Sequence, residues 1–158
     1  MARNRWENRN RLLRKMKALP EETKAAIKAS LVESGQEIVA AQKRAVPKRT
    51  GALAASIALT MGGNLPKYAS FGGGAVQGAP DLTAIISAGN ERARHAHLVE
   101  FGTAPHINGG RFAGSQHPGA KAQPFFYGPY RALKKRAKSR VTRATRKAAR
   151  KVASGAGS

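Results

Sequence analysis

The sequence contains no cysteine, few acidic residues and few aromatic ones. Without cysteine the chain can form neither a disulfide nor a thiolate metal site. Aspartate and glutamate number 8 against 29 lysines and arginines, and aromatic residues make up 6% of the chain. The length of 158 residues fits one domain with extensions, and so small an aromatic content predicts a modest hydrophobic core.

Long apolar runs are also missing. No apolar stretch approaches the roughly 20 residues that cross a bilayer, so the sequence predicts no transmembrane helix. The basic start, residues 1–6, is followed by no apolar run of the kind that a signal peptide needs. We therefore expect a protein that is made in the cytoplasm and makes no contact with a membrane.

The positive charge is concentrated at the two ends of the chain. Residues 1–19 hold seven bases and one acid, and residues 131–151 hold eleven bases and no acid. Such arms favour a polyanion, either nucleic acid or an acidic protein surface, with a merely solvated face as the alternative. The candidate residues for contacting a polyanion are Arg131, Lys134, Lys135, Arg136, Arg140, Arg143, Arg146 and Arg150.

Helix and strand signals predict an α+β fold, in which a small antiparallel β-sheet packs with two long helices and glycine-rich loops. We predict a basic N-terminal extension over residues 1–19, with a short helix, and a core over residues 20–130. A basic C-terminal helix with a short disordered tail follows over residues 131–158. Pro20 followed by acids predicts the start of the first long helix. Val46 before a proline predicts its end.

The rest of the predicted core alternates short elements with loops. We expect a turn and short helical piece over 50–57, strands over 56–61, 81–88 and 123–126, and irregular glycine-rich segments over 62–80 and 103–121. A short helix is expected between a cap at Asn90 and a stop at Gly102.

Both long helices carry a stripe of small or apolar residues. In the first, the stripe runs through Ile27, Leu31, Ser34 or Gly35, Ile38, and Ala41 or Ala45. The second helix is predicted from Pro129 to about Ala153, with the stripe Leu133, Ala137, Val141, Ala144, Ala148 and Val152. Because alanine buries little area, this stripe needs a neighbour, and a copy of the same protein is the simplest candidate.

Residues that could support catalysis or hold a metal ion are not in usable patterns. The four histidines, at positions 95, 97, 106 and 117, do not follow the spacing of a zinc site. The central acids Asp81, Glu91 and Glu100 are too few for a paired-carboxylate site, and the glycines at 72–74 lack the context of a phosphate loop. We expect no enzyme activity, no cofactor and no small-molecule substrate.

Three short motifs stand at transitions between predicted elements. The first, residues 46–57, contains Thr50-Gly51 in a tight turn, and the second, residues 97–103, contains Phe101-Gly102-Thr103 at a helix stop. The third, residues 123–130, places aromatic residues before the last helix. The candidate structural or interface residues are Thr50, Gly51, Leu53, Ser56, Glu100, Phe101, Gly102, Thr103, Pro124 and Phe125.

In this order and spacing, the three motifs resemble the tail-component, or neck-protein, family of long-tailed phages with HK97-type morphogenesis genes. The resemblance runs from about Pro20 to Val152, through P-x-x-TG-x-L-x-x-S-I, V-E-F-G-T and P-F-x-x-P. The sequence departs from the pattern at Gly128, where a larger residue is commoner, and in the extension before Pro20.

The resemblance implies a structural virion protein at the head–tail junction. It implies a ring, most simply of six copies, around the DNA channel between head-completion proteins and the tail terminator or tail tube. Thr50 and Glu100 would hold local turns and contacts between subunits. The basic arms would line the channel or dock on acidic neighbours, and we favour docking because a cationic lumen would retard sliding DNA. A basic nucleic-acid-binding protein is the alternative from another class.

Overall fold

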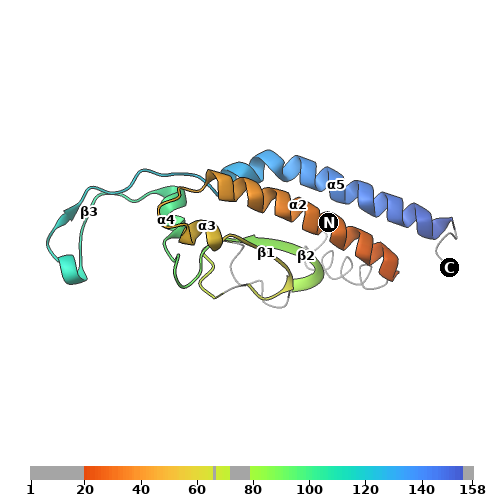
Figure 1. Ribbon diagram of the computed structural model, residues 1–158, viewed down its shortest axis with the longest axis horizontal. Helices are drawn as coiled ribbons and strands as arrows, with labels where there is room; N and C mark the ends of the chain where they lie inside the picture. The colour runs from red at the N-terminus through yellow and green to blue at the C-terminus, as the bar shows by residue number, and fades with distance from the viewer. Residues whose placement is uncertain (1–19, 66, 72–78, 155–158) are drawn as a thin grey trace, which may run out of the picture.

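The computed structural model describes residues 20–65, 67–71 and 79–154, and the predicted N-terminal helix lies outside this range. Two long antiparallel helices lie side by side, and a β-hairpin packs on one of them (Figure 1). A thin arm projects from one end of this body. The α+β class predicted from the sequence is confirmed.

The first long helix, α2 (Glu21–Ala45), lies between its two neighbours. Glu21 and Glu22 stand in its first turn and Lys43 and Arg44 in its last. At each end, the side-chain charges have the sign that the helix dipole stabilises. The helix ends before Val46, whose ψ of 136° is extended, as expected for a residue that precedes proline. Both predicted ends of this helix are therefore confirmed.

The buried face of α2 is more polar than the predicted stripe. Ile27, Ser34, Gly35 and Ile38 are buried as expected, but Thr23, Ser30 and Gln42 are buried beside them. A Cβ atom at Gly35 would lie 2.6 Å from Cδ1 of Leu59, so this glycine allows the close approach of the helix and the hairpin. One α2 surface thus serves both the hairpin and the second long helix.

The second long helix, α5 (Tyr127–Ala153), packs along α2 over most of its length. Its stripe residues Leu133, Ala137, Val141, Ala144 and Ala148 are half-buried, and the side chain of Val152 lies outside the described residues. The inference that this stripe needs a second copy is corrected, because α2 of the same chain is its neighbour. The predicted boundary at residue 131 falls inside α5.

The hairpin joins β1 (Ala58–Gly63) to β2 (Ala79–Ser87), as predicted. The strands are antiparallel, pairing Ala58 with Ser87 and Met61 with Ala84, and the register shifts between Met61 and Gly63. This sheet packs on α2. A short helix, α3 (Ala52–Ala55), precedes it and confirms the predicted helical piece.

Three local predictions are wrong. Asn90 accepts hydrogen bonds from the backbone N–H groups of Arg92 and Ala93, so it caps a separate turn, and the helix α4 (Ala96–Phe101) begins only after His95. Residues 123–126 form no strand, because the N–H groups of Phe125 and Phe126 bind the side chain of Glu100 and that of Gln123 binds the carbonyl of Val99. The irregular segment 103–121 contains a second hairpin, β3 (His106–Ile107) with β4 (Gln116–His117), and a 3-10 turn, η1 (Gly110–Phe112).

The main hydrophobic cluster lies where α2 ends and α3, α4 and the start of α5 meet. It consists of Val46, Leu53, Ile57, Phe71, Ala88, Ala93, Ala96, Phe125 and Phe126. All three sequence motifs contribute to this cluster or to its immediate surroundings. The core is therefore concentrated at the end of the body from which the arm projects (Figure 1).

Candidate functional site: a motif junction and its projecting arm

Glu100, from the second motif, ties α4 to the start of α5. One carboxylate oxygen accepts hydrogen bonds from the N–H groups of Phe125 and Phe126, both at 2.8 Å, and the other accepts from Tyr127 at 3.1 Å. The first N–H groups of a helix lack partners within the helix, and a negative charge there is favoured by the dipole. Glu100 is buried and holds the connection between the two helices, while its predicted contact with another subunit stays a prediction.

Phe125 and Phe126, from the third motif, pack around Phe71. The ring of Phe71 stacks on Phe126 with centroids 4.7 Å apart and meets Phe125 edge-on at 6.3 Å. Phe71 lies within the segment that the sequence predicted as loop, and its burial was missed. The sequence signal was present, because Phe71 is the single phenylalanine in that glycine-rich stretch.

Ser56 and Gln42 complete the junction with buried hydrogen bonds. The hydroxyl of Ser56, from the first motif, donates to the carbonyl of Leu53 at 2.7 Å and accepts from the N–H of Gly89 at 3.1 Å. The side-chain amide of Gln42 donates to the carbonyl of Phe126 at 3.0 Å. Gln42 was missed because a polar residue was not expected in the stripe, although it lies four residues after Ile38.

The remaining residues of the first motif shape the turn before α3. Gly51 has a φ of 77°, a left-handed conformation, and the Thr50 hydroxyl oxygen lies 3.4 Å from the N–H of Ala52. Leu53 is buried, whereas Thr50 is exposed. These placements agree with the predicted turn.

An open groove of about 440 Å³ runs beside this junction. It is lined by residues before and within α3, by α4 and by the chain that returns from the arm, including Pro47, Arg49, Leu53, Leu98, Val99 and Gln123. Its walls are largely apolar, and Leu98 remains 42% exposed within it. Arg49, His95 and Lys121 are its basic members.

The arm, defined as residues 103–121, leaves the junction at Gly102. A Cβ atom at Gly102 would lie 2.6 Å from the carbonyl oxygen of Ala120, and φ is 75°, so both space and conformation require glycine. Thr103 and Ala120 then exchange backbone hydrogen bonds of 2.9 and 3.1 Å at the root. No residue of the arm is buried. Pro124 and Phe101, at its root, are also exposed.

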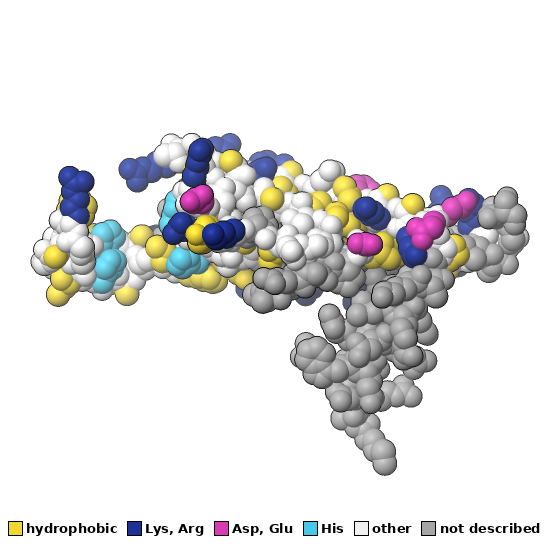
Figure 2. Space-filling model, turned by 90° about the horizontal axis from the view of Figure 1, so that it is seen from below, with side chains coloured by type: hydrophobic (Ala, Val, Ile, Leu, Met, Phe, Trp, Pro, Cys, Tyr) yellow, Lys and Arg dark blue, Asp and Glu magenta, His cyan; other side chains and the backbone are white. Residues whose placement is uncertain are grey.

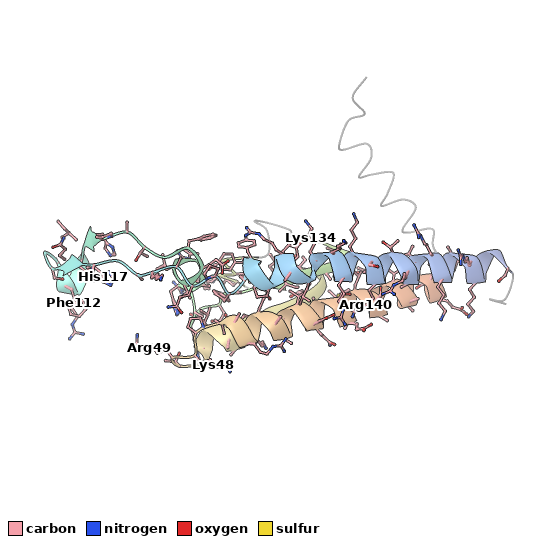
Figure 3. The ribbon with its side chains drawn as sticks, turned by 90° about the horizontal axis from the view of Figure 1, so that it is seen from above. Lys48, Arg49, Phe112, His117, Lys134 and Arg140 are labelled. Atoms are coloured by element: carbon pink, nitrogen blue, oxygen red, sulfur yellow. The ribbon has the colours of Figure 1, made fainter. Side chains whose placement is uncertain are left out.

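The tip of the arm carries apolar side chains in solvent. Ile107 is 73% exposed and Phe112 is 69% exposed, the two highest values among the large hydrophobic residues that the structure describes. Figure 3 shows Phe112 and His117 far out on the arm, away from Arg49 at the end of α2. Apolar side chains of this size in solvent mark a contact surface when they gather.

The predicted polyanion-contacting residues divide into two groups. Arg140 is largely buried against α2, where it pairs with Glu33 at 3.3 Å and Glu37 at 2.9 Å and donates to Ser34 at 3.0 Å. Arg136 also pairs with Glu37, at 3.0 Å. These two arginines hold the helix pair together, and Arg140 has little surface left for a polyanion.

The other predicted bases face solvent and form no ion pair within the described residues. They are Arg131, Lys134, Lys135, Arg143, Arg146 and Arg150. Figure 3 shows Lys134 on the outer side of α5, opposite the side on which Arg140 reaches α2. Lys151, at the far end of α5, pairs with Glu22 at 2.8 Å. This hydrogen bond, helped by the charge of Lys151, holds the pKa of Glu22 below its ordinary value.

The histidines gather on the arm and near its root (Figure 2). His106 and His117 face each other across β3 and β4 with ring centroids 5.0 Å apart. Within the described part of the chain, no group of three or more histidines and acids is placed to hold a metal ion. Among the same residues, no helix is both long enough and apolar enough to span a membrane.

The fold and the site define an α+β module, in which a junction of motif residues on a helix pair carries a projecting arm. Residues 10–102 match the model of a family described as "Bacteriophage HK97-gp10, putative tail-component". The chain belongs to this family, which confirms the resemblance drawn from the motifs. It is therefore a phage tail component with a structural role in the virion. No curated protein and no solved structure matches the chain.

The family match and the motif resemblance overlap over residues 20–102 and differ at both ends. The match begins at residue 10, inside the predicted N-terminal extension, and ends at residue 102, where the arm begins. The arm, the third motif and α5 lie beyond it. The family match therefore gives no information on these three parts.

Proposed function

We propose that the protein is a ring subunit at the phage head–tail junction. Copies of the chain, most simply six, surround the DNA channel and join the head-completion proteins to the tail terminator or tail tube. The subunits assemble in the host cytoplasm and remain in the virion. The role is structural and involves no catalysed reaction, cofactor or small-molecule substrate.

The observation that carries this proposal is the arm. It has a defined shape, because Asn108 and Ser115 bind each other through backbone and side-chain hydrogen bonds of 2.8 and 2.9 Å. It also has no buried residue and ends in Ile107 and Phe112. An ordered segment that covers no core and exposes its largest apolar side chains has the character of an assembly surface.

The arm and the groove allow copies of the chain to add head-to-tail. The exposed apolar tip and the groove are different surfaces of one chain, so a copy that places its tip in a neighbour's groove leaves its own groove open to a third copy, whereas two copies that exchanged tips would stop at a two-fold dimer. Head-to-tail contacts close into rings when the rotation between copies closes. The stripe on α5 is occupied by α2, and the arm therefore replaces it as the proposed surface for self-association.

The test is the mass of the purified chain across a range of concentrations. Light scattering should show a species near six times the subunit mass of 16.8 kDa, and electron microscopy should show rings. Antibody labelling of intact virions should place the protein at the neck. A monomer at every concentration, combined with absence from virions, would overturn the proposal.

Binding of duplex DNA is a second candidate function, favoured by the solvent face of α5. The exposed basic side chains there, among them Arg143, Arg146 and Arg150, form no ion pair with an acidic residue within the described part of the chain. DNA affinity should then fall with salt at a log–log slope of about −0.9 per phosphate contact. Tight DNA binding by a stable monomer supports this function, whereas a salt-resistant ring without DNA supports the first.

A further inference from the structure

Within the residues that the structure describes, no segment of the chain occupies the groove beside the motif junction. Leu98 lines it and is 42% exposed, although Leu98 belongs to a helix whose neighbouring residues Ala96 and Glu100 are buried. Pro47 and Leu53 lie on the side of α3, and Val99 and Gln123 lie on the side of the arm root. The result is an apolar surface at the end of the body nearest the arm.

The arm of the same chain cannot fill this groove. Ala120 and Lys121, at the arm root, line the groove themselves, and the tip extends away from the body (Figures 1 and 3). The root is fixed by the Thr103–Ala120 hydrogen bonds and by the close approach at Gly102, so the arm has no hinge there that would fold it back. An arm that enters the groove must therefore come from another copy.

The sizes of the two surfaces agree. A phenylalanine side chain buries about 150–250 Å² of surface. The groove has a volume of about 440 Å³, which we take as room for Phe112 with part of Ile107. A stable pair of proteins buries about 800 Å² on each partner. Since every residue of the arm is at least partly exposed, the tip and the flanks of the arm can together supply that area.

Resting on the ring proposed above, we infer that the arm of each copy docks in the groove of the next. Phe112 enters between Pro47 and Leu98, with Ile107 beside it, and each interface uses one arm and one groove. Of the six large hydrophobic residues that are exposed in the described chain, Leu98, Ile107 and Phe112 would be covered in this contact. The contact is directional, and where the rotation between copies closes it produces a ring in which every tip and every groove is occupied.

The charges of the arm tip and the groove provide a test of which molecule occupies the groove. Arg111 precedes Phe112 and is exposed, and the groove contains the basic residues Arg49 and Lys121. In the docked arm, like charges therefore approach one another, and the contact should strengthen at higher salt. Arg111→Glu should tighten self-association severalfold. If the tip instead binds an acidic partner protein, the same substitution weakens that binding and does not strengthen the ring.

The main experiment mixes two variants that are each defective in one surface. Phe112→Asp removes a functional tip, and Leu98→Glu removes a functional groove. Each variant alone should remain monomeric, with at least a tenfold weaker association than the wild type. An equimolar mixture should form heterodimers, because one intact tip and one intact groove remain, but it should form no closed ring. Circular dichroism of each variant should match that of the wild type, since both side chains are exposed in the single subunit.

A disulfide reports the same contact in the assembled state. Because the chain has no native cysteine, Phe112→Cys combined with Leu98→Cys should give covalent multimers after oxidation, up to the number of copies in the ring. Each single-cysteine variant should give none of this ladder. Phe112 lies far out on the arm (Figure 3), away from the helix α4 that carries Leu98 (Figure 1), so the bond is expected between copies and not within one chain.

The outcomes separate this inference from the proposed ring. Rings that persist in both single variants and yield no covalent ladder overturn the arm-in-groove contact and leave the ring intact. A wild-type chain that never self-associates overturns both. Monomeric single variants whose mixture also stays monomeric would contradict the directional contact.

Discussion

The junction and the arm use the same residue types for opposite purposes. Of the five phenylalanines, Phe71, Phe125 and Phe126 are buried in the junction, whereas Phe101 and Phe112 are 64% and 69% exposed at the arm root and tip. A chain so poor in aromatic residues leaves two of its phenylalanines in solvent. The comparison teaches that the body is stabilised by its own contacts, whereas the arm leaves its largest apolar side chains exposed, as the proposed contact with another copy requires.

The largest effect that tests this comparison is expected from Phe125→Ala. Phe125 is fully buried, so its loss should lower the free energy of unfolding by about 4 kcal/mol. The matched variant Phe112→Ala should change it by less than about 0.5 kcal/mol, because that ring contributes little to the isolated subunit. Chemical denaturation followed by circular dichroism measures both. Equal decreases in the free energy of unfolding for the two variants would contradict the distinction between junction and arm.

Glu100 should give the next largest effect. Glu100→Ala leaves three N–H groups at the start of α5 without their acceptor and should cost about 3 kcal/mol of unfolding free energy. Glu100→Gln keeps the shape and one acceptor oxygen, and should cost about 2 kcal/mol. The same denaturation experiment gives the ranking. If Glu100→Ala left the free energy of unfolding unchanged, the arm root and α5 would not be coupled through this carboxylate.

A smaller effect is expected from the arginines of α5. Arg140→Ala removes contacts with Glu33, Glu37 and Ser34 and should destabilise the subunit by about 1 kcal/mol, since the pair with Glu33 is partly screened by solvent. Arg143→Ala, three residues away and exposed, should leave stability unchanged within about 0.5 kcal/mol. In a DNA-binding assay the order should reverse, with Arg143→Ala the more damaging. Identical behaviour of the two variants would contradict the division of α5 into two faces.

The smallest effect concerns the exposed pair of Glu22 and Lys151. Because Lys151 lowers the pKa of Glu22 in the folded chain, this pair stabilises the fold above the ordinary pKa of 4.5, and the contribution is lost as pH falls through the lowered pKa. NMR titration of the Glu22 carboxyl carbon should show that lowered pKa, and Lys151→Met should return it toward 4.5. High salt should weaken the shift in the wild type. An unchanged titration in the variant would assign the shift to another cause.

Local signals in the sequence predicted most of the body. Pro20 and Val46 marked both ends of α2, Gly51 and Gly102 marked turns, and the order of the motifs indicated the family before the structure was known. Neighbours in space were harder to predict. The stripe on α5 did not indicate that α2 covers it. Nothing near Glu100 in the sequence indicated that its carboxylate accepts hydrogen bonds from residues 125–127, of which 125 and 126 were predicted as strand.

The arm was the largest omission, for a physical reason. Its strands are two residues long and contain no alternating pattern, so periodicity has nothing to detect. Its shape comes from side-chain and backbone hydrogen bonds around Asn108 and Ser115 and from the pairing at its root. Composition predicts such a segment as irregular, and the pairing of β3 with β4 and of Thr103 with Ala120 shows that it is a hairpin.

That pairing makes the arm a separable part. The chain leaves and re-enters the body at two adjacent points, so the segment from residue 104 to residue 119 can be replaced by a tight turn without moving either attachment. Hairpins of other lengths or with other tips can be grafted onto the same scaffold. A change in reach or in partner would then require only a local insertion or deletion, while the helix pair and the junction keep their present structure.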